Sequence, residues 1–256
     1  MKIWNMGNTT ARNPLRLREA LQLFVARMSE RPFRKQEQLE FQNAMIDAGL
    51  VESERREEGD DGGFASYAPA YLEWAVWRLF LAINDLAGSI SDTRGFKIDE
   101  DMNPIHHARG GAADLIFTYD TFKIVCEMTL TTGSRQFAAE GEPVTRHVYK
   151  AIENSGDKPV YGLFVAKNVD PNTSDAFHNA RYWRDWRTFV DTPIIALNIK
   201  QVIALIQRMR IFPVTVAEIR ELFESILKLQ KNFENGPAWH EAYSIFYEKW
   251  LASSED

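Results

Sequence analysis

Two short apolar runs separated by two residues constrain the fold of this 256-residue chain more than any other feature. The runs Ala113–Tyr119 and Phe122–Met128 are rich in Ile, Val, Phe and Tyr, and Asp120 and Thr121 lie between them. Short β-rich runs with a two-residue connection are typical of a β-hairpin. The sequence therefore predicts two antiparallel strands over residues 113–128.

Each predicted strand carries a carboxylate where an apolar residue would be expected, Asp114 in the first and Glu127 in the second. Side chains alternate across a strand, so the second strand has a predicted core face and a predicted site face. The core face holds Phe122, Ile124, Cys126 and Met128, and the site face holds Lys123, Val125, Glu127 and Thr129. A register that places Asp114 beside Glu127 would bring two hard oxygen donors to one ion. Mg²⁺, for which Mn²⁺ can substitute, suits such ligands.

Further acidic residues flank the predicted hairpin. Glu73 lies in a predicted apolar helix, Ala70–Ala87, one turn before Trp77. An acid near a helix start has the alternative role of complementing the helix dipole. Glu140 falls in a predicted polar turn that ends before Pro143, the expected first residue of a helix that carries His147.

The remaining apolar runs predict an α/β core, with one mixed sheet of four or five strands flanked by helices. The other predicted strands are Phe96–Asp99, Val160–Ala166 and Ile194–Leu197, and the later helices are Asp170–Phe189, Ile199–Met209, Val214–Leu229 and Pro237–Leu251. The charged, glycine-rich stretch Glu52–Phe64 indicates a boundary between a helical region, 1–65, and a main domain, 66–256.

Composition limits the partners of the chain. A net charge of −6 disfavours a general nucleic-acid coat protein, and one cysteine excludes an internal disulfide. No apolar run is long enough to cross a bilayer, so we expect a cytoplasmic protein. Basic residues that could contact DNA are Arg12, Arg16, Arg34, Lys35, Arg109 and Arg135, although the amino-terminal group fits a solvated helical face better than a DNA-contacting patch.

Acids on two strands and on flanking helices suit metal-assisted attack of water on a phosphodiester. The twelve residues between Asp114 and Glu127, followed by Thr129, resemble the PD-(D/E)xK nuclease core with threonine in place of the usual lysine. Longer similar segments are Leu72-Glu73-Trp74, Phe96–Glu100, Pro104–Ala108, Glu127-Met128-Thr129, Gln136-Phe137 and Glu140–His147. Together they resemble the catalytic domain of AlwI-type type IIS restriction endonucleases, a group that includes site-specific nicking enzymes and small catalytic subunits of heterodimers. Residues 3–14 resemble the opening of the same proteins.

The resemblance implies that Glu73, Asp114, Glu127 and Glu140 form a metal site and that His147 assists at the scissile phosphate. Thr129 cannot supply the positive charge of the usual lysine, so Lys123, Arg146 or a second metal ion would have to supply it. The sequence therefore suggests Thr129, Lys123 and Arg146 as supporting residues.

We therefore expect a Mg²⁺-dependent endonuclease that acts on double-stranded DNA. The long recognition region of full-size relatives is missing, so a second subunit, or a homodimer, would supply sequence recognition. The alternatives are a non-catalytic DNA- or partner-binding subunit that keeps the nuclease fold, and a structure-directed repair nuclease.

Overall fold

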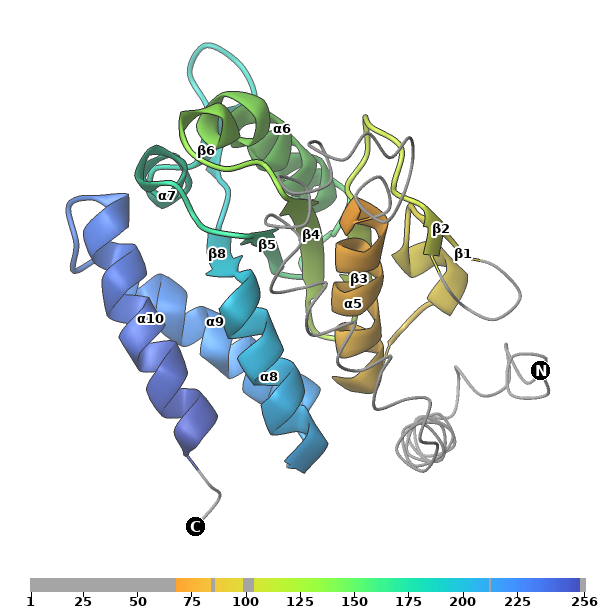
Figure 1. Cartoon of the computed structure of the whole chain (residues 1–256). Coiled ribbons are helices and arrows are strands. Elements are labelled where there is room, and N and C mark those ends of the chain that lie inside the picture. The colour runs from red at the N-terminus through yellow and green to blue at the C-terminus, as the bar shows by residue number, and fades with distance from the viewer. Residues whose placement is uncertain (1–67, 84–85, 99–103, 212, 254–256) are drawn as a thin grey trace, which may run out of the picture.

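The computed structural model describes residues 68–83, 86–98, 104–211 and 213–253 (Figure 1). The predicted amino-terminal helices, the domain boundary near residue 65 and the basic residues Arg12, Arg16, Arg34 and Lys35 lie outside the described residues. Within these ranges, no helix is both long and apolar enough to span a bilayer.

A four-stranded mixed sheet forms the centre of the protein. Its strands are β3 (Leu115–Thr118), β4 (Lys123–Thr129), β5 (Val160–Ala166) and β8 (Ile194–Asn198), in the order β3-β4-β5-β8. β3 and β4 are antiparallel, whereas β4, β5 and β8 run parallel to one another. The predicted hairpin and the predicted α/β class with a mixed sheet are confirmed.

Helices cover both faces of the sheet (Figure 1). One face packs against α6 (Ser134–Glu153) and α7 (Pro171–His178), and the other packs against α5 (Ala68–Ile83), α8 (Ile199–Ile211), α9 (Val216–Gln230) and α10 (Gly236–Ala252). Val125 is fully buried with Val144 and Val148 of α6. The predicted site face of β4 is therefore mostly core, and only its carboxyl end, at Glu127 and Thr129, is left for a site.

Helix α6 begins at Ser134, nine residues before the predicted start at Pro143. Gly133, with a φ of 63°, precedes the helix in a left-handed conformation that glycine tolerates best. Pro143 then lies inside the helix, where it cannot donate a backbone hydrogen bond to the preceding turn. The prediction of a polar turn around Glu140 is wrong, because Glu140 is helical.

A second error concerns residues 179–191, where the sequence predicts that a helix continues to Phe189. Helix α7 ends at His178, and two short antiparallel strands follow, β6 (Arg181–Trp183) and β7 (Phe189–Asp191). Tyr182 of β6 stacks on Tyr149 of α6, which gives the ribbon a tertiary contact that local helix propensity does not reveal. Another small ribbon, β1 (Lys97–Ile98) with β2 (Pro104–His106), lies beside α5, after a 3₁₀ turn at Ile90–Thr93.

Candidate active site

The pairing of β3 with β4 brings Asp114 and Glu127 together. Leu115 is paired with Cys126, so Asp114, one residue earlier, lies opposite Glu127. The backbone N–H of Met128 donates a hydrogen bond of 2.8 Å to Asp114 Oδ2. This contact holds the Asp114 carboxylate across the end of the β4 strand, on the side of Glu127.

Glu73 reaches the same region from α5. Its side chain is buried, and its Oε2 accepts a hydrogen bond of 2.7 Å from the backbone N–H of Ala108, in the segment after β2. Burial and the nearby charge of Asp114 raise the pKa of Glu73 to about 8. Glu73 lies beyond the first turn of α5, so complementing the helix dipole is not its role.

His147 holds Glu127 in place. The imidazole Nδ1 lies 2.5 Å from Glu127 Oε1, and both side chains are almost completely buried. Burial raises the pKa of Glu127, while the hydrogen bond to His147 opposes that shift. Since the carboxylate accepts, the Nδ1 proton is directed at Glu127, and the Nε2 lone pair is left facing Arg146, whose Nη1 lies 3.5 Å away.

The pKa of Asp114 is also raised. Burial, followed by the charge of Glu127, raises its pKa to about 7, and Glu140 adds a smaller effect in the same direction. Glu140 is seven residues before His147 on α6 and therefore on the same face of that helix. We call Glu73, Asp114, Glu127 and Glu140 the acidic cluster, because their charges influence one another.

The donor set of the acidic cluster suits a hard divalent cation. Glu73, Asp114 and Glu127 each use one oxygen in a hydrogen bond, and within the described part of the chain the other oxygen accepts none. As placed, no three Asp, Glu, His or Cys side chains of the described residues are grouped tightly enough to hold one ion. Mg²⁺ commonly takes only one or two protein carboxylates, with water and substrate phosphate completing its shell. Asp114 and Glu127 fit that smaller requirement.

The predicted supporting residues separate into two groups. Arg146 contacts His147 and stabilises the charged form of Glu127, so it brings a cation to the cluster. Lys123 brings no cation to the acidic cluster, because its Nζ donates a hydrogen bond to the Asn154 carbonyl oxygen beyond the end of α6. Lys123 begins β4, about 13 Å of extended chain before Glu127, so its predicted part in place of the usual lysine is wrong. Thr129 accepts the N–H of Thr131 through its hydroxyl, which gives it a role in shaping the turn.

Arg109 and Arg135 are both exposed. Arg109 follows Ala108, whose N–H binds Glu73, and Arg135 lies in the first turn of α6. DNA contact by these two arginines stays a prediction.

The sequence assigned no positioning role to two groups that orient this region. One is the backbone N–H of Ala108, which carries no side-chain signal. The other is Gln136, which is fully buried and donates to the carbonyl oxygens of Thr131 and Asn168 while accepting from the N–H of Asp170. Gln136 thereby ties the segment after β4 to the segment after β5 and fixes the start of α6.

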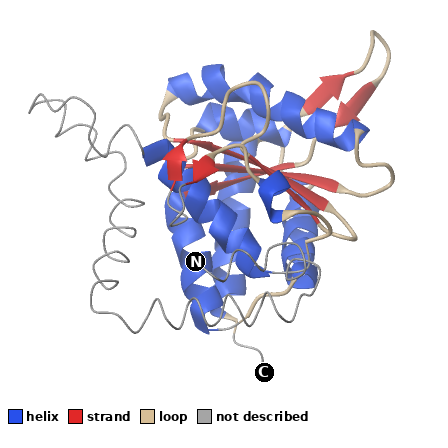
Figure 2. Cartoon of the chain, turned by 90° about the vertical axis from the view of Figure 1, so that its right-hand side faces the viewer, coloured by secondary structure: helices blue, strands red, loops and turns tan. Residues whose placement is uncertain are grey.

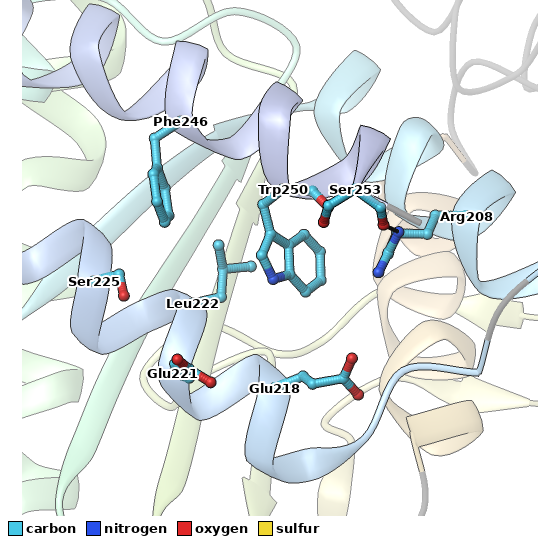
Figure 3. A pocket seen from close by; sticks show the side chains of 8 residues that line it. All are labelled: Arg208, Glu218, Glu221, Leu222, Ser225, Phe246, Trp250 and Ser253. Atoms are coloured by element: carbon cyan, nitrogen blue, oxygen red, sulfur yellow. Dashed lines mark hydrogen bonds between the residues drawn. The ribbon is translucent and has the colours of Figure 1, made fainter. Parts of the chain in front are cut away.

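A cavity of about 310 Å³ lies elsewhere, between the carboxyl-terminal helices α8, α9 and α10 (Figure 3). Arg208, Glu218 and Trp250 are among its lining residues, and none of the predicted site residues lines it. Arg208 is bound to the carbonyl oxygens of Leu251 and Ser253, and Glu218 belongs to the capping box of α9. These side chains stabilise helix ends, so the cavity adds nothing to the acidic cluster.

A mixed sheet flanked by helices, with acids gathered at the paired ends of two strands, is the architecture of restriction-endonuclease-like proteins. The chain belongs to the AlwI restriction endonuclease family, whose model matches residues 2–205. Its structure is similar to that of the small subunit of the heterodimeric restriction endonuclease R.BspD6I. The TM-score is 0.58 at 22% identity, over 81% of this chain and 98% of that one. No curated protein matches the sequence.

Proposed function

We propose that this chain is a Mg²⁺-dependent DNA endonuclease that hydrolyses phosphodiester bonds of double-stranded DNA. The observation that carries the proposal is the acidic cluster itself, in a chain of a restriction endonuclease family. Four mutually repelling carboxylates, three of them held by hydrogen bonds, are costly unless a cation offsets their charge. A divalent ion bound there supplies Lewis-acid stabilisation of the phosphate and a bound water of lowered pKa.

The residues of the chain orient the site. Met128 N–H fixes Asp114, Ala108 N–H fixes Glu73, and His147 fixes Glu127. Because His147 is buried and engaged with Glu127, we assign it to positioning this carboxylate rather than to direct contact with the scissile phosphate. Arg146 opposes the rise that burial causes in the pKa of Glu127, and its side chain is 29% exposed and paired with the exposed Glu142 at 2.9 Å. On release from Glu142 it would bring a cation to a phosphate oxygen in place of the missing lysine.

We infer that recognition of a DNA sequence comes from a second protein, as in a type IIS or strand-nicking heterodimer. The structural neighbour is itself the small subunit of a heterodimeric enzyme. The net charge of −6 also disfavours strong binding of phosphates by the chain alone. A homodimer that combines two copies is the other arrangement that would supply a second DNA contact.

Incubation with supercoiled plasmid tests the activity. We expect the purified chain to convert plasmid to the nicked or linear form in Mg²⁺ or Mn²⁺ and to leave it intact in EDTA. Cleavage at one defined site is expected only when the recognition subunit is added. Metal-independent cleavage would contradict the metal proposal. Absence of cleavage under every condition, together with retained binding to a partner, would favour a non-catalytic subunit.

Substitution of His147 tests its positioning role. We expect His147→Ala to lower cleavage about 10- to 100-fold, the usual effect of removing a group that orients a metal ligand. His147→Asn keeps an N–H donor near the place of Nδ1 and should recover part of the activity. The alanine variant should also need more Mg²⁺ for half-maximal cleavage, which loss of a purely structural side chain would not produce.

DNA binding in Ca²⁺ is the control for this variant, because binding is then measured without turnover. We expect His147→Ala and Glu140→Ala to bind duplex DNA within about twofold of the unaltered chain. A loss of binding equal to the loss of cleavage would show that these side chains contribute to DNA affinity and not to the metal site.

A further inference from the structure

The ribbon formed by β6 and β7 presents an unusual outer surface. Trp186 is 100% exposed, Trp183 56% and Phe189 43%, so half of the six large exposed hydrophobic residues in the described ranges belong to this short segment. Arginines alternate with these rings along the chain, at Arg181, Arg184 and Arg187. We call residues 181–191 the aromatic ribbon. Figure 2 shows it standing away from the body of the protein, at the upper right.

The aromatic ribbon is ordered by contacts of its own. At the base, the N–H of Thr192 donates to Ala180, and near the tip the N–H of Arg184 donates to Thr188. Asp185 accepts hydrogen bonds from the N–H groups of Arg187 and Thr188 and from the Thr188 hydroxyl. The carboxylate of Asp185 is therefore turned toward its own loop. The backbone that carries the exposed rings is consequently ordered before any partner binds.

Stacking attaches the aromatic ribbon to the helix that carries the active-site histidine. The rings of Tyr182 and Tyr149 are 4.4 Å apart and nearly parallel. Tyr149 follows His147 by two residues, or about 3 Å of helix rise. The tip, four residues beyond Tyr182, lies at most about 13 Å from Tyr182. This separation is shorter than one helical turn of duplex DNA, roughly 34 Å, so a duplex bound at the acidic cluster is long enough to reach the tip.

The outer face combines rings with cations. The Arg181 guanidinium stacks over Phe189 at 4.5 Å, and Trp183 meets Phe189 edge to face at 5.2 Å. A stacked guanidinium keeps its N–H groups in plane and free to bind phosphate. Arg184 lies 3.6 Å from Glu153 and also interacts with the Tyr149 side chain, whereas Arg187 is exposed. The face is thus suited to a polyanion that also offers flat rings or sugars.

We propose that the aromatic ribbon is a DNA-binding element that contacts the duplex flanking the cleavage site. The arginines bind backbone phosphates, and Trp186 with its neighbouring rings packs on deoxyribose and on the edges of bases in the groove. The charge of the element favours DNA over a protein partner, because its arginines concentrate positive charge on a chain whose net charge is −6. A two-stranded ribbon also fits a DNA major groove. The inference rests on the proposed function, because it takes DNA as the substrate.

Fluorescence anisotropy of a labelled duplex of about 30 base pairs tests the proposal, with the full chain in Ca²⁺ at low salt. We expect Arg184→Ala/Arg187→Ala to bind about tenfold more weakly and to reduce the salt dependence of binding by up to about two phosphate contacts. Lys200→Ala/Lys249→Ala, which removes the same charge from exposed positions on α8 and α10, should change the affinity less than twofold.

Substitution of the tip residue separates stacking from charge. Trp186→Ala should weaken binding about fivefold to tenfold through loss of apolar contact area, whereas Trp186→Phe should bind almost as the unaltered chain. Ile245→Ala is the matched control, since Ile245 is an exposed apolar residue, 50% accessible, on α10. DNA should also quench tryptophan fluorescence in the unaltered chain and quench it less in Trp186→Phe.

Unchanged DNA affinity in all ribbon variants would overturn this inference and assign the surface to a protein partner. Cleavage of plasmid by the same preparations keeps the two proposals distinct. If the chain binds DNA through the ribbon but does not cut in Mg²⁺, the proposed function fails and the DNA-binding element stands. If the chain cuts DNA, and the ribbon variants bind and cut normally, the proposed function stands and the DNA-binding role of the ribbon fails.

Discussion

Asp114→Asn and Glu127→Gln are each expected to abolish plasmid cleavage while leaving the fold intact. Loss of one metal-binding charge removes several kcal/mol of transition-state stabilisation, which corresponds to a fall in rate on the order of a thousandfold or more. Both substitutions keep a side-chain oxygen in place. The amide oxygen introduced at position 114 can still accept from the N–H of Met128, and the one introduced at position 127 can still accept from His147. The hydrogen bonds that order the region therefore survive.

The same two variants should be more stable than the unaltered chain when no metal is present. Asp114 and Glu127 raise one another's energy in their charged forms, so removal of either charge relieves the repulsion. Thermal unfolding in EDTA at pH 8 measures this effect. Asp157→Asn and Glu241→Gln are matched controls, because they make the same chemical change at exposed positions outside the acidic cluster. Cleavage at the unaltered rate would reject the assignment, and a large fall in Tm would indicate that the carboxylates serve the fold.

The central strands could be predicted because their residues obey a local rule. Val160–Ala166 is apolar throughout and flanked by Pro159, which marks a buried strand by length and composition, and the structure has the strand at the same residues. The alternation in β4 likewise separated Glu127 from the core side chains, although the sequence placed it mid-way down the strand. The register that brings Asp114 opposite Glu127 was left open by the sequence, and the pairing of Leu115 with Cys126 supplies it.

The errors arose where tertiary contacts decide the local structure. Proline favours a helix start, which pointed to Pro143, whereas Gly133 and the buried Gln136 set the start of α6 nine residues earlier. The segment after His178 became a ribbon because Tyr182 stacks on Tyr149, a contact more than thirty residues away. Neither the hydrogen bonds of Gln136 nor the stacking of Tyr182 on Tyr149 can be recognised from a local sequence pattern.

In the candidate site, too, single residues could be predicted from the sequence, whereas the contacts that hold them could not. The identity of the acids followed from the resemblance and from single residues in apolar surroundings. Their anchoring did not, since Ala108 and Met128 contribute only backbone N–H groups. Lys123 was a reasonable substitute for a missing lysine on the basis of its face of the strand, but distance along β4 excluded it. The catalytic roles of the four acids and of His147 stay predictions.

The stability of the metal-free protein is expected to fall as the pH rises from about 5 to about 8.5. In the folded chain the pKa of Glu73 is about 8 and that of Asp114 about 7, against ordinary values of 4.5 and 3.8. Between these limits the folded state binds more protons than the unfolded state, so the free energy of unfolding decreases with pH. Each such proton contributes at most about 1.4 kcal/mol per pH unit, and solvent screening reduces this at the partly exposed Asp114.

Mg²⁺ should reverse this loss, and more strongly at high pH. A carboxylate must lose its proton to bind a cation, so metal and proton compete for Asp114 and Glu127, and metal binding releases protons. We therefore expect Mg²⁺ to raise Tm by several degrees at pH 8.5 and by little at pH 5.5, with a parallel rise in cleavage rate. Glu73→Gln should flatten the pH dependence in EDTA, whereas Glu241→Gln should leave it unchanged. A Tm that is constant from pH 6 to 8.5 without metal, or an equal Mg²⁺ effect at both ends, would show that the acidic cluster neither stores repulsion nor binds the ion.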